Sequence, residues 1–334
     1  MGYRPSAVTG KAAKPAAKQR EQKMRLSTLK SGVGAGIAFI ASAAAAVADD
    51  TLPAIGKPVD GATGFQPAAT IVARHIHGLE GMMVYIMTAI VLLVTVLLAY
   101  VIIRFNAKSN PKAAKFTHNT PLEVAWTLIP IVILVVIGAY SLPVLFEEEE
   151  IPTADLTIKA TGNQWYWHYD YVDVSDQFGF DSYMIGSPAN VTDAEQKDGV
   201  QPYIMNDAMK AKLAKAGYSP DEFKLAVDNP LVVPVGKTVV VQVTGNDVIH
   251  SWKVPAFGVM QDAVPGRVAE TWFKADKPGI YFGQCSELCG KDHAFMPIEV
   301  KVLSQEDYAK WQAQAKKLFA SADVPAAPVQ LASN

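Results

Sequence analysis

The sequence predicts a two-helix transmembrane hairpin followed by an all-β domain of the sandwich or barrel type. Two apolar segments, residues 82–103 and 124–146, contain no charged residue, and each is long enough to cross a bilayer. From Thr153 onward, short runs rich in β-branched residues alternate with Gly and Pro, a pattern typical of a β sandwich or barrel. The net charge of −2 over 334 residues gives no reason to expect a nucleic-acid partner.

The N-terminal region predicts a secretory signal peptide. Residues 1–30 are basic, residues 33–45 are apolar, and Ala46-Val47-Ala48 supplies the small-residue cleavage pattern. A short first transmembrane helix is the alternative, but the apolar run falls short of the ~20 residues that span a bilayer. We therefore expect residues 1–48 to be removed. Residues 49–80 then form an external segment that is Gly/Pro-rich and irregular to about residue 68.

The charges beside the two apolar segments predict the topology. The link between them carries Arg104, Lys108, Lys112 and Lys115, and positive charge in a short loop favours the cytoplasmic side. The second segment leads into four consecutive glutamates, residues 147–150, which suits the opposite side. Both termini and the β domain are therefore expected outside the cytoplasm, with the lipid membrane as a partner of this multi-pass chain.

The β domain is expected to span residues 151–303. Strand-like runs recur at Leu156–Ala160 and in five later segments, residues 231–243, 248–254, 268–274, 280–283 and 297–303. Residues 186–223 are polar and lack alternation, so they are interpreted as a surface insertion. Asn206 is positioned to cap a helix within it that Gly217 ends. The remaining residues, 304–334, are expected to form a helix capped by Ser304 and Asp307, followed by a disordered tail.

One loop concentrates the soft metal ligands of the chain. Cys285, Cys289, His293 and Met296 lie within it, and these are the only two cysteines present. His250 ends an earlier strand-like run and is a candidate additional ligand. A disulfide between the cysteines is the simplest alternative, because exported thiols usually oxidise. Structural zinc is another, although zinc sites favour a closed Cys/His tetrahedron without methionine.

The ligand types favour copper. A single blue-copper centre needs two histidines, one cysteine and a weak axial methionine, and this chain has that set plus a second cysteine. The surplus thiolate indicates two metals bridged by both sulfurs, each with one histidine. Met296 then serves one copper as a weak ligand, and a backbone carbonyl such as that of Glu287 serves the other.

The loop sequence Gly-Gln-Cys-Ser-Glu-Leu-Cys-Gly-Lys-Asp-His-Ala-Phe-Met-Pro resembles the dinuclear copper (CuA) loop of cytochrome c oxidase subunit II. The resemblance extends to the aromatic stretch at 162–171, to the segments 181–184, 250–252 and 262–267, and to Leu-Glu-Val-Ala-Trp-Thr at 122–127. It implies a cupredoxin-like domain that carries two copper ions. The implied ligands are His250, Cys285, Cys289, His293, Met296 and the Glu287 carbonyl.

The resemblance also implies functional roles. Trp165 is implied as the residue through which electrons from cytochrome c arrive, and the Glu287 side chain as a ligand of magnesium shared with subunit I. Electrons would pass to haem in subunit I for oxygen reduction coupled to proton pumping, with subunit III as a further partner. Six acids are expected to attract a lysine-rich cytochrome c by their charge: Asp170, Asp173, Asp176, Asp181, Asp228 and Asp247.

Glu123 has two interpretations. From its spacing it is an acid in the first turn of a helix, stabilised by the helix dipole, whereas the resemblance implies that it stands at the entrance to a proton path. Two features depart from the family pattern: Met260 stands where a lysine is usual, and the insertion 186–223 is absent from the shortest members. The signal peptide and the insertion favour a bacterial inner-membrane protein with its β domain in the periplasm.

The copper ligands and the two apolar segments argue against other functions. A quinol oxidase subunit would lack the copper ligands, and a nitrous oxide reductase would be a soluble enzyme with a propeller domain. A membrane-anchored copper-binding or chaperone protein is the main alternative, but it would not need the aromatic stretch around Trp165.

Overall fold

The computed structural model describes residues 52–112, 114–174 and 177–319. The expected signal peptide and the expected C-terminal tail lie outside these ranges.

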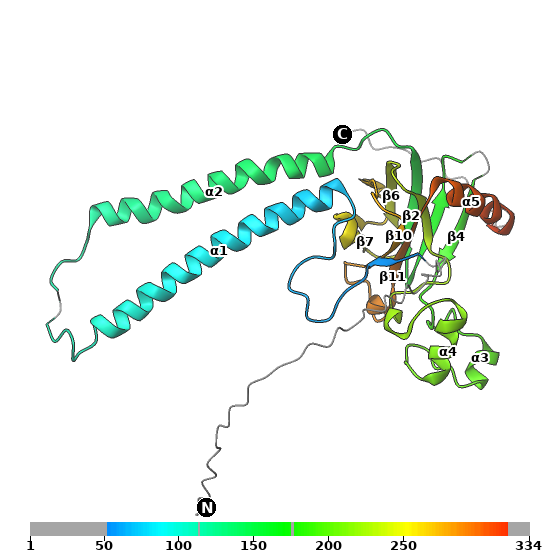
Figure 1. Ribbon diagram of the computed structural model, residues 1–334, viewed down its shortest axis with the longest axis horizontal. Coiled ribbons are helices and arrows are strands. Elements are labelled where there is room, and N and C mark those ends of the chain that lie inside the picture. The colour runs from blue at the N-terminus through cyan, green and yellow to red at the C-terminus, as the bar shows by residue number, and fades with distance from the viewer. Residues whose placement is uncertain (1–51, 113, 175–176, 320–334) are drawn as a thin grey trace, which may run out of the picture. The chain divides into compact units, whose positions relative to one another are not determined.

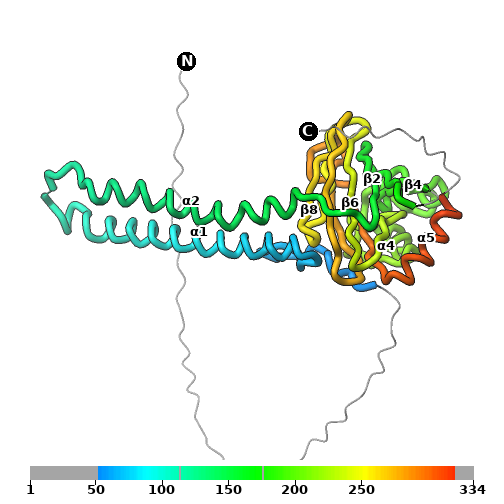
Figure 2. Tube along the Cα trace, turned by 90° about the horizontal axis from the view of Figure 1, so that it is seen from above, coloured from blue at the N-terminus to red at the C-terminus, as the bar shows by residue number. Residues whose placement is uncertain are grey.

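Two long helices form an antiparallel hairpin, α1 (Ile71–Arg104) and α2 (Thr120–Glu149). They lie side by side in both views (Figures 1 and 2). Each has a side-chain cap: the Thr70 hydroxyl accepts from the Ala73 amide, and Asn119 Oδ1 accepts from the Leu122 amide. Such caps satisfy backbone donors that have no partner within the helix. Helix α1 begins well before the apolar segment because residues 71–81, which include charged and histidine side chains, form the first turns of the same helix.

The hairpin exposes apolar side chains around its circumference. Leu93 on α1 and Leu134 on α2 are 60% and 67% exposed, and both helices are long and apolar enough to cross a membrane. Helices without a polar face are stable in hydrocarbon, because every interior backbone group is paired within the helix. Pro130 and Pro143 interrupt that pairing in α2.

The β domain contains two main sheets. One has the order β1-β10-β11-β5 and the other β4-β3-β2-β6-β9, while β7 and β8 pair separately. The strands of the first sheet are β1 (Ala54–Gly56), β5 (Leu231–Pro234), β10 (Gly279–Gln284) and β11 (Pro297–Leu303). Those of the second are β2 (Leu156–Asn163), β3 (Tyr166–Tyr171), β4 (Phe178–Ser182), β6 (Val239–Gly245) and β9 (Ala269–Phe273). The separate pair is β7 (His250–Val254) and β8 (Val259–Ala263), and Met260 of β8 lies opposite Lys253 of β7.

One apolar core joins the sheets. Ile158 and Val241 contribute to it from the second sheet, Val300 and Tyr281 from the first, and Trp252 from β7, all with no exposed surface. Burial of each large side chain stabilises the fold by roughly 1.5–3 kcal/mol. Both cysteines and Met296 belong to this same core, so the metal loop packs directly against the two sheets.

Four strands, β1, β3, β4 and β8, were not expected from the sequence. In β3, the buried residues Trp167, Tyr169 and Tyr171 alternate with half-buried Tyr166, His168 and Asp170. Aromatic rings on both faces hide this alternation, since a sequence pattern does not distinguish a half-buried tyrosine from a buried one. β1 lies in the segment expected to be irregular, and that expectation is wrong for its three residues, which pair with β10.

The inserted segment (residues 186–223) has its own structure. It contains α3 (Asp193–Lys197), α4 (Asp207–Lys215) and the short 3-10 helix η1 (Pro220–Glu222). The predicted cap is confirmed, because Asn206 Oδ1 accepts from the Met209 amide at 2.8 Å. A small second core surrounds Met209 and Leu213, separate from that of the sandwich.

The C-terminal helix α5 (Gln305–Phe319) packs on the outside of the sandwich. Ser304 Oγ accepts from the Asp307 amide at 3.1 Å, as its capping pattern predicts. Trp311 and Phe319 contact the rings of Tyr171 and Phe178, so the helix covers one end of the core.

Candidate metal centre

His250 is the first residue of β7 and has no exposed surface. Its Nδ1 atom lies 3.9 Å from Cys285 Sγ. Its Nε2 atom lies 2.8 Å from Asp247 Oδ1, three residues earlier in the chain. With Nε2–H donating to the carboxylate, the lone pair of Nδ1 faces the thiols, which is the arrangement of a histidine that binds a metal.

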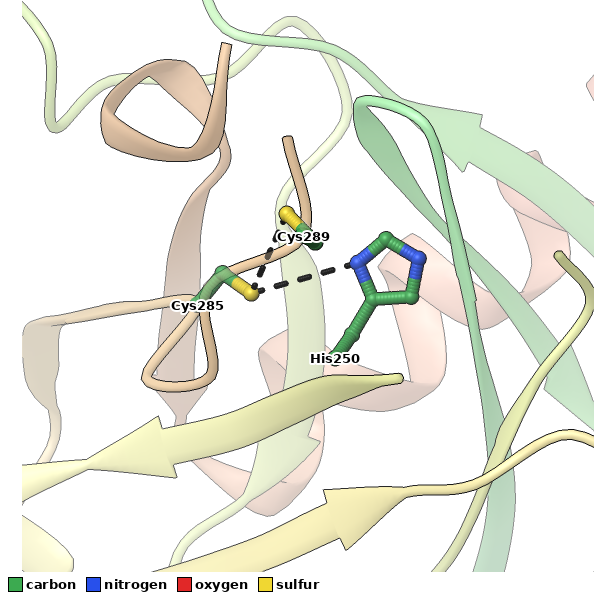
Figure 3. A group of neighbouring side chains, drawn as sticks. All are labelled: His250, Cys285 and Cys289. Atoms are coloured by element: carbon green, nitrogen blue, oxygen red, sulfur yellow. Dashed lines mark hydrogen bonds between the residues drawn. The ribbon is translucent and has the colours of Figure 1, made fainter. Parts of the chain in front are cut away.

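The two cysteines face each other across a short gap. Their Sγ atoms are 3.8 Å apart, and Figure 3 shows both thiols and the His250 ring directed toward one another. Cys285 follows β10, and its amide donates to the Met296 carbonyl at 3.1 Å, so the two ends of the loop are tied together. The potential ligand atoms of His250, Cys285 and Cys289 all lie within 4.8 Å of one another.

His293 and Met296 extend this cluster. His293 opens the 3-10 helix η3 (His293–Phe295), and its Nδ1 lies 3.6 Å from Cys289 Sγ. Met296 follows η3 and is 1% exposed within the core. The Glu287 carbonyl oxygen lies 3.3 Å from Cys285 Sγ. All six sequence-predicted copper ligands are therefore in one region, and four nitrogen and sulfur atoms stand in the row His250, Cys285, Cys289, His293.

These donors fit metal ions better than a disulfide. Sulfur atoms in a disulfide are about 2.05 Å apart, whereas two thiolates that each bind one ion at about 2.3 Å can be up to roughly 4.6 Å apart. Burial and the neighbouring Cys285 raise the pKa of Cys289 to about 12. Without metal the Cys289 thiol therefore keeps its proton, and metal binding would displace it.

Asp247 holds His250 in place. Partial burial opposes ionisation of Asp247, but hydrogen bonds from His250 Nε2 and from the amides of Val248 and Gln164 outweigh it and lower its pKa. Asp247 was expected only as a cytochrome c docking residue, and its contact with His250 was not predicted. The spacing Asp-x-x-His at the start of a strand was the signal that pointed to it.

Gly162 makes room for His250. A Cβ atom on Gly162, the penultimate residue of β2, would lie 2.7 Å from the imidazole Cδ2 atom. Real side chains do not approach so closely, so glycine is required for the ring to pack against β2. The motif around Trp165 thus supports the metal site as well as the strand.

Trp165 contacts the metal loop directly. Its Nε1–H donates to the Cys289 carbonyl at 3.2 Å, and Gln164 Nε2 donates to the same oxygen at 2.8 Å. Lys291 Nζ lies 4.8 Å from the Trp165 ring centroid, within the range of a cation–π interaction. Gly290, with a φ of 125°, lets the loop turn beneath this ring. The tryptophan is partly exposed, so its ring connects the surface to the loop.

The two remaining glutamates of the predicted site lie apart from the thiols. Glu287 has an exposed side chain although its carbonyl faces Cys285. Glu123 is in the first turn of α2, where its Oε1 accepts from the Asn119 amide at 3.3 Å. This contact is the one expected of an acid that stabilises a helix start.

The acids expected to form the docking surface differ in their surroundings. Asp170 and Asp181 both bind the His168 ring, at 3.1 and 2.7 Å. Asp228 accepts from the amides of Tyr183 and Asn229 and from the Asn190 side chain. Asp173 is exposed, and Asp176 lies outside the described residues.

The similarity of this chain to known proteins covers both parts of the fold. Residues 156–303 match the model for the periplasmic domain of cytochrome c oxidase subunit II, and residues 58–144 match that for its transmembrane domain. The cytochrome c oxidase subunit 2 of Cereibacter sphaeroides is 56% identical over 294 residues, covering 88% of this chain and 93% of that one. The chain belongs to the cytochrome c oxidase subunit II family.

A more distant relative agrees with this assignment. The probable cytochrome c oxidase subunit 2 of Rickettsia bellii is 45% identical, with 80% of this chain and 89% of that one covered. A crystal structure of the periplasmic domain of subunit II of cytochrome oxidase from Bradyrhizobium japonicum covers 51% of this chain and 99% of that one, with 49% identity and a TM-score of 0.39.

Membership of the cytochrome c oxidase subunit II family establishes the general function. Members of this family work in an oxidoreductase complex, cytochrome c oxidase, and electron transfer through the CuA centre is the family function. Its β domain has the cupredoxin-like fold, and its two apolar helices make this chain an inner-membrane protein that partners with oxidase subunit I.

Proposed function

We propose that two copper ions are held by His250, Cys285, Cys289, His293, Met296 and the Glu287 carbonyl. The observation that carries this proposal is the row of four donor atoms, with successive separations of 3.9, 3.8 and 3.6 Å, in a chain of this family. A central pair of thiols flanked by one histidine on each side supplies two equivalent half-sites. The methionine and the carbonyl are the weak ligands that complete them.

The bound pair supplies one-electron chemistry, in which a single electron is shared between both coppers. The protein contributes rigidity. Asp247 fixes the His250 tautomer, the Cys285–Met296 backbone hydrogen bond closes the loop, and burial in the core excludes water. A site whose ligands do not move on oxidation has a small reorganisation cost, which suits electron transfer.

Trp165 is the residue through which electrons reach this centre. Its indole N–H donates to the Cys289 carbonyl. A short path therefore leads from the partly exposed ring, across this hydrogen bond and along the covalent bonds of Cys289, to the Cys289 sulfur. In the oxidase, Trp165→Gln should slow electron transfer from cytochrome c and leave the copper spectrum unchanged. A loss of the copper signal in that variant would make Trp165 a structural residue.

Copper content is the first test of the ligand assignment. The full-length chain, purified within its oxidase, should contain two copper ions per chain and no stoichiometric zinc in this domain. Cys289→Ser should lose the purple mixed-valence absorption, because one bridging sulfur is gone. A single copper with a blue-copper spectrum, or zinc alone, would refute the assignment.

Two glutamates extend the function beyond copper. The exposed Glu287 carboxylate binds magnesium shared with subunit I, since carboxylates are preferred ligands of that ion and the neighbouring carbonyl faces the copper site. Glu123 stands at the entrance to a proton path as well as capping α2. The haem that receives the electrons belongs to the partner subunit I, and subunit III completes the assembly.

The β domain and both termini face the periplasm, and residues 1–48 are a removed signal peptide. The basic link between α1 and α2 supports this orientation.

Cytochrome c docks near Trp165, attracted by Asp170, Asp173, Asp176, Asp181, Asp228 and Asp247. The association rate should fall as ionic strength rises.

A further inference from the structure

The inserted segment contacts the metal loop through an aromatic stack. The Tyr203 ring lies 4.1 Å from the Phe295 ring, centroid to centroid, with an interplanar angle of 22°. Lys224, immediately after the segment, places Nζ 5.2 Å from the Phe295 centroid. Both contacts fall on Phe295, so the inserted segment and the residue that follows it hold the loop two residues after His293.

Phe295 is placed where its position controls two ligands. It ends the short helix η3 that begins at His293, and it directly precedes Met296. Its amide donates to the Asp292 carbonyl at 2.9 Å. Because η3 is a single turn with no side-chain cap, its geometry depends on outside contacts. Movement of the Phe295 ring would displace His293 and Met296 together.

The inserted segment is firmly attached on its other side. The buried Glu299 of β11 accepts from the Tyr218 hydroxyl at 2.8 Å and from the Val227 amide at 3.1 Å. The small core around Met209 and Leu213 makes the segment rigid. It is thus a structured body fixed to β11 that reaches across to η3.

The backbone of Tyr203 has an unfavourable conformation. Its φ of 65° is in the left-handed region, which is unfavourable for a tyrosine and persists only where the surroundings impose it. The Tyr203 amide donates to the Gly186 carbonyl at 2.9 Å, which fixes this conformation. A residue that merely filled surface space would not need a strained backbone.

We propose that the inserted segment is a clamp on the ligand loop, with Tyr203 as its positioning residue. This inference rests on the proposed copper site. The clamp holds His293 and Met296 at their binding distances. It also restricts the movement of η3 away from the cysteines that the release of copper would require. Its effects are slow copper release and a fixed reduction potential of the centre.

The decisive variant is Tyr203→Asn in the full-length chain within the purified oxidase. Asparagine tolerates the left-handed backbone, so the fold should be retained while the ring stack is lost. Copper release to a chelator should become about tenfold or more faster, the size of effect expected for a residue that orients ligands, and the reduction potential should shift. Tyr203→Phe keeps the stack and should release copper nearly as slowly as the wild type.

Ile204→Asn is the matched control, because Ile204 is adjacent, 51% exposed and outside the stack. It should leave copper release and potential unchanged. If Tyr203→Asn releases copper at the wild-type rate and keeps the wild-type potential, the clamp is refuted. The copper content of the wild type decides the proposed function separately: a wild type without two coppers would overturn that function, whereas the Tyr203 comparison tests only the clamp.

Discussion

At the scale of single residues, the candidate centre depends on groups that do not bind metal themselves. Asp247 orients His250, Gly162 provides space for its ring, and Gln164 and Trp165 both hydrogen-bond to the Cys289 carbonyl. A contact to a ligand's second ring nitrogen, such as that of Asp247 to His250, sets the ligand's orientation, and its loss typically costs about 10–100-fold in metal affinity.

Asp247→Ala should weaken copper binding by about 10–100-fold, because His250 Nε2 loses its acceptor and the ring can rotate away from Cys285. Asp247→Asn should recover part of this loss, since the amide oxygen still accepts a hydrogen bond. Equilibrium competition with a copper chelator measures both variants.

The exposed Asp173 provides the control for Asp247. Asp173→Ala removes one negative charge without touching His250, so it should alter only the salt dependence of the reaction with cytochrome c. Equal copper affinities in Asp247→Ala and the wild type would mean that Asp247 acts through its charge alone.

His168 predicts a pH dependence of stability. Hydrogen bonds to Asp170 and Asp181 raise the pKa of His168 to about 9, from an ordinary value of about 6.5. The folded state therefore binds this proton more tightly than the unfolded state. The resulting stabilisation is complete below pH ~6.5, declines as pH rises and is lost above pH ~9.

Thermal unfolding of the wild type and His168→Gln at several pH values tests this linkage. The wild type should exceed the variant in midpoint most clearly near pH ~6, and the difference should shrink toward pH ~10. A difference that stays constant with pH would show that His168 contributes by packing and not by its charge.

At the scale of elements, the attachment of the inserted segment depends on one buried acid. The Glu299 side chain has no exposed surface, and burial raises its pKa. Glu299→Ala would leave the Val227 amide without an acceptor and the Tyr218 hydroxyl with only the Val227 carbonyl at 3.3 Å. This should cost about 2 kcal/mol of unfolding free energy. Glu299→Gln keeps one acceptor oxygen and should cost about 1 kcal/mol.

Denaturant unfolding measures these free energies. Glu306→Ala is the control: it removes an exposed partner of Lys310 on α5, and a surface ion pair contributes little, ~0.5 kcal/mol. Were Glu299→Ala as stable as Glu306→Ala, the hydrogen bonds of Glu299 would not anchor the inserted segment.

The elements that could be predicted from the sequence are those with strong local patterns. The two apolar segments, the capped helices at Asn206 and Ser304 and the valine-rich strands all carry such a pattern. β3 could not be recognised because two of its three outward residues, Tyr166 and His168, are also aromatic. The three-residue β1 depends on pairing with β10, more than 200 residues away in sequence, and has no local pattern.

The site likewise has residues that a sequence pattern reveals and contacts that only the fold creates. Cys285, Cys289, His293 and Met296 are close in sequence, and His250 was predicted from its place at the end of a strand-like run 35 residues earlier. The Tyr203–Phe295 stack joins segments that only the tertiary fold brings together. Spacing alone contains no information about such contacts.

At the scale of the whole molecule, the proposed orientation makes a labelling prediction. Ser109 lies in the link between α1 and α2, and Asp173 lies in the β domain, both exposed. With a membrane-impermeant thiol reagent on intact spheroplasts, Asp173→Cys should react, whereas Ser109→Cys should react only after the membrane is disrupted. The opposite pattern would reverse the topology.

We propose that one electron is shared by two copper ions bridged by Cys285 and Cys289. Electron paramagnetic resonance of the oxidised full-length chain in its oxidase is the most direct test of this sharing. We expect a hyperfine pattern split by two equivalent copper nuclei, lost in Cys289→Ser. A pattern split by one copper nucleus, or the absence of any copper signal from the intact wild-type domain, would contradict it.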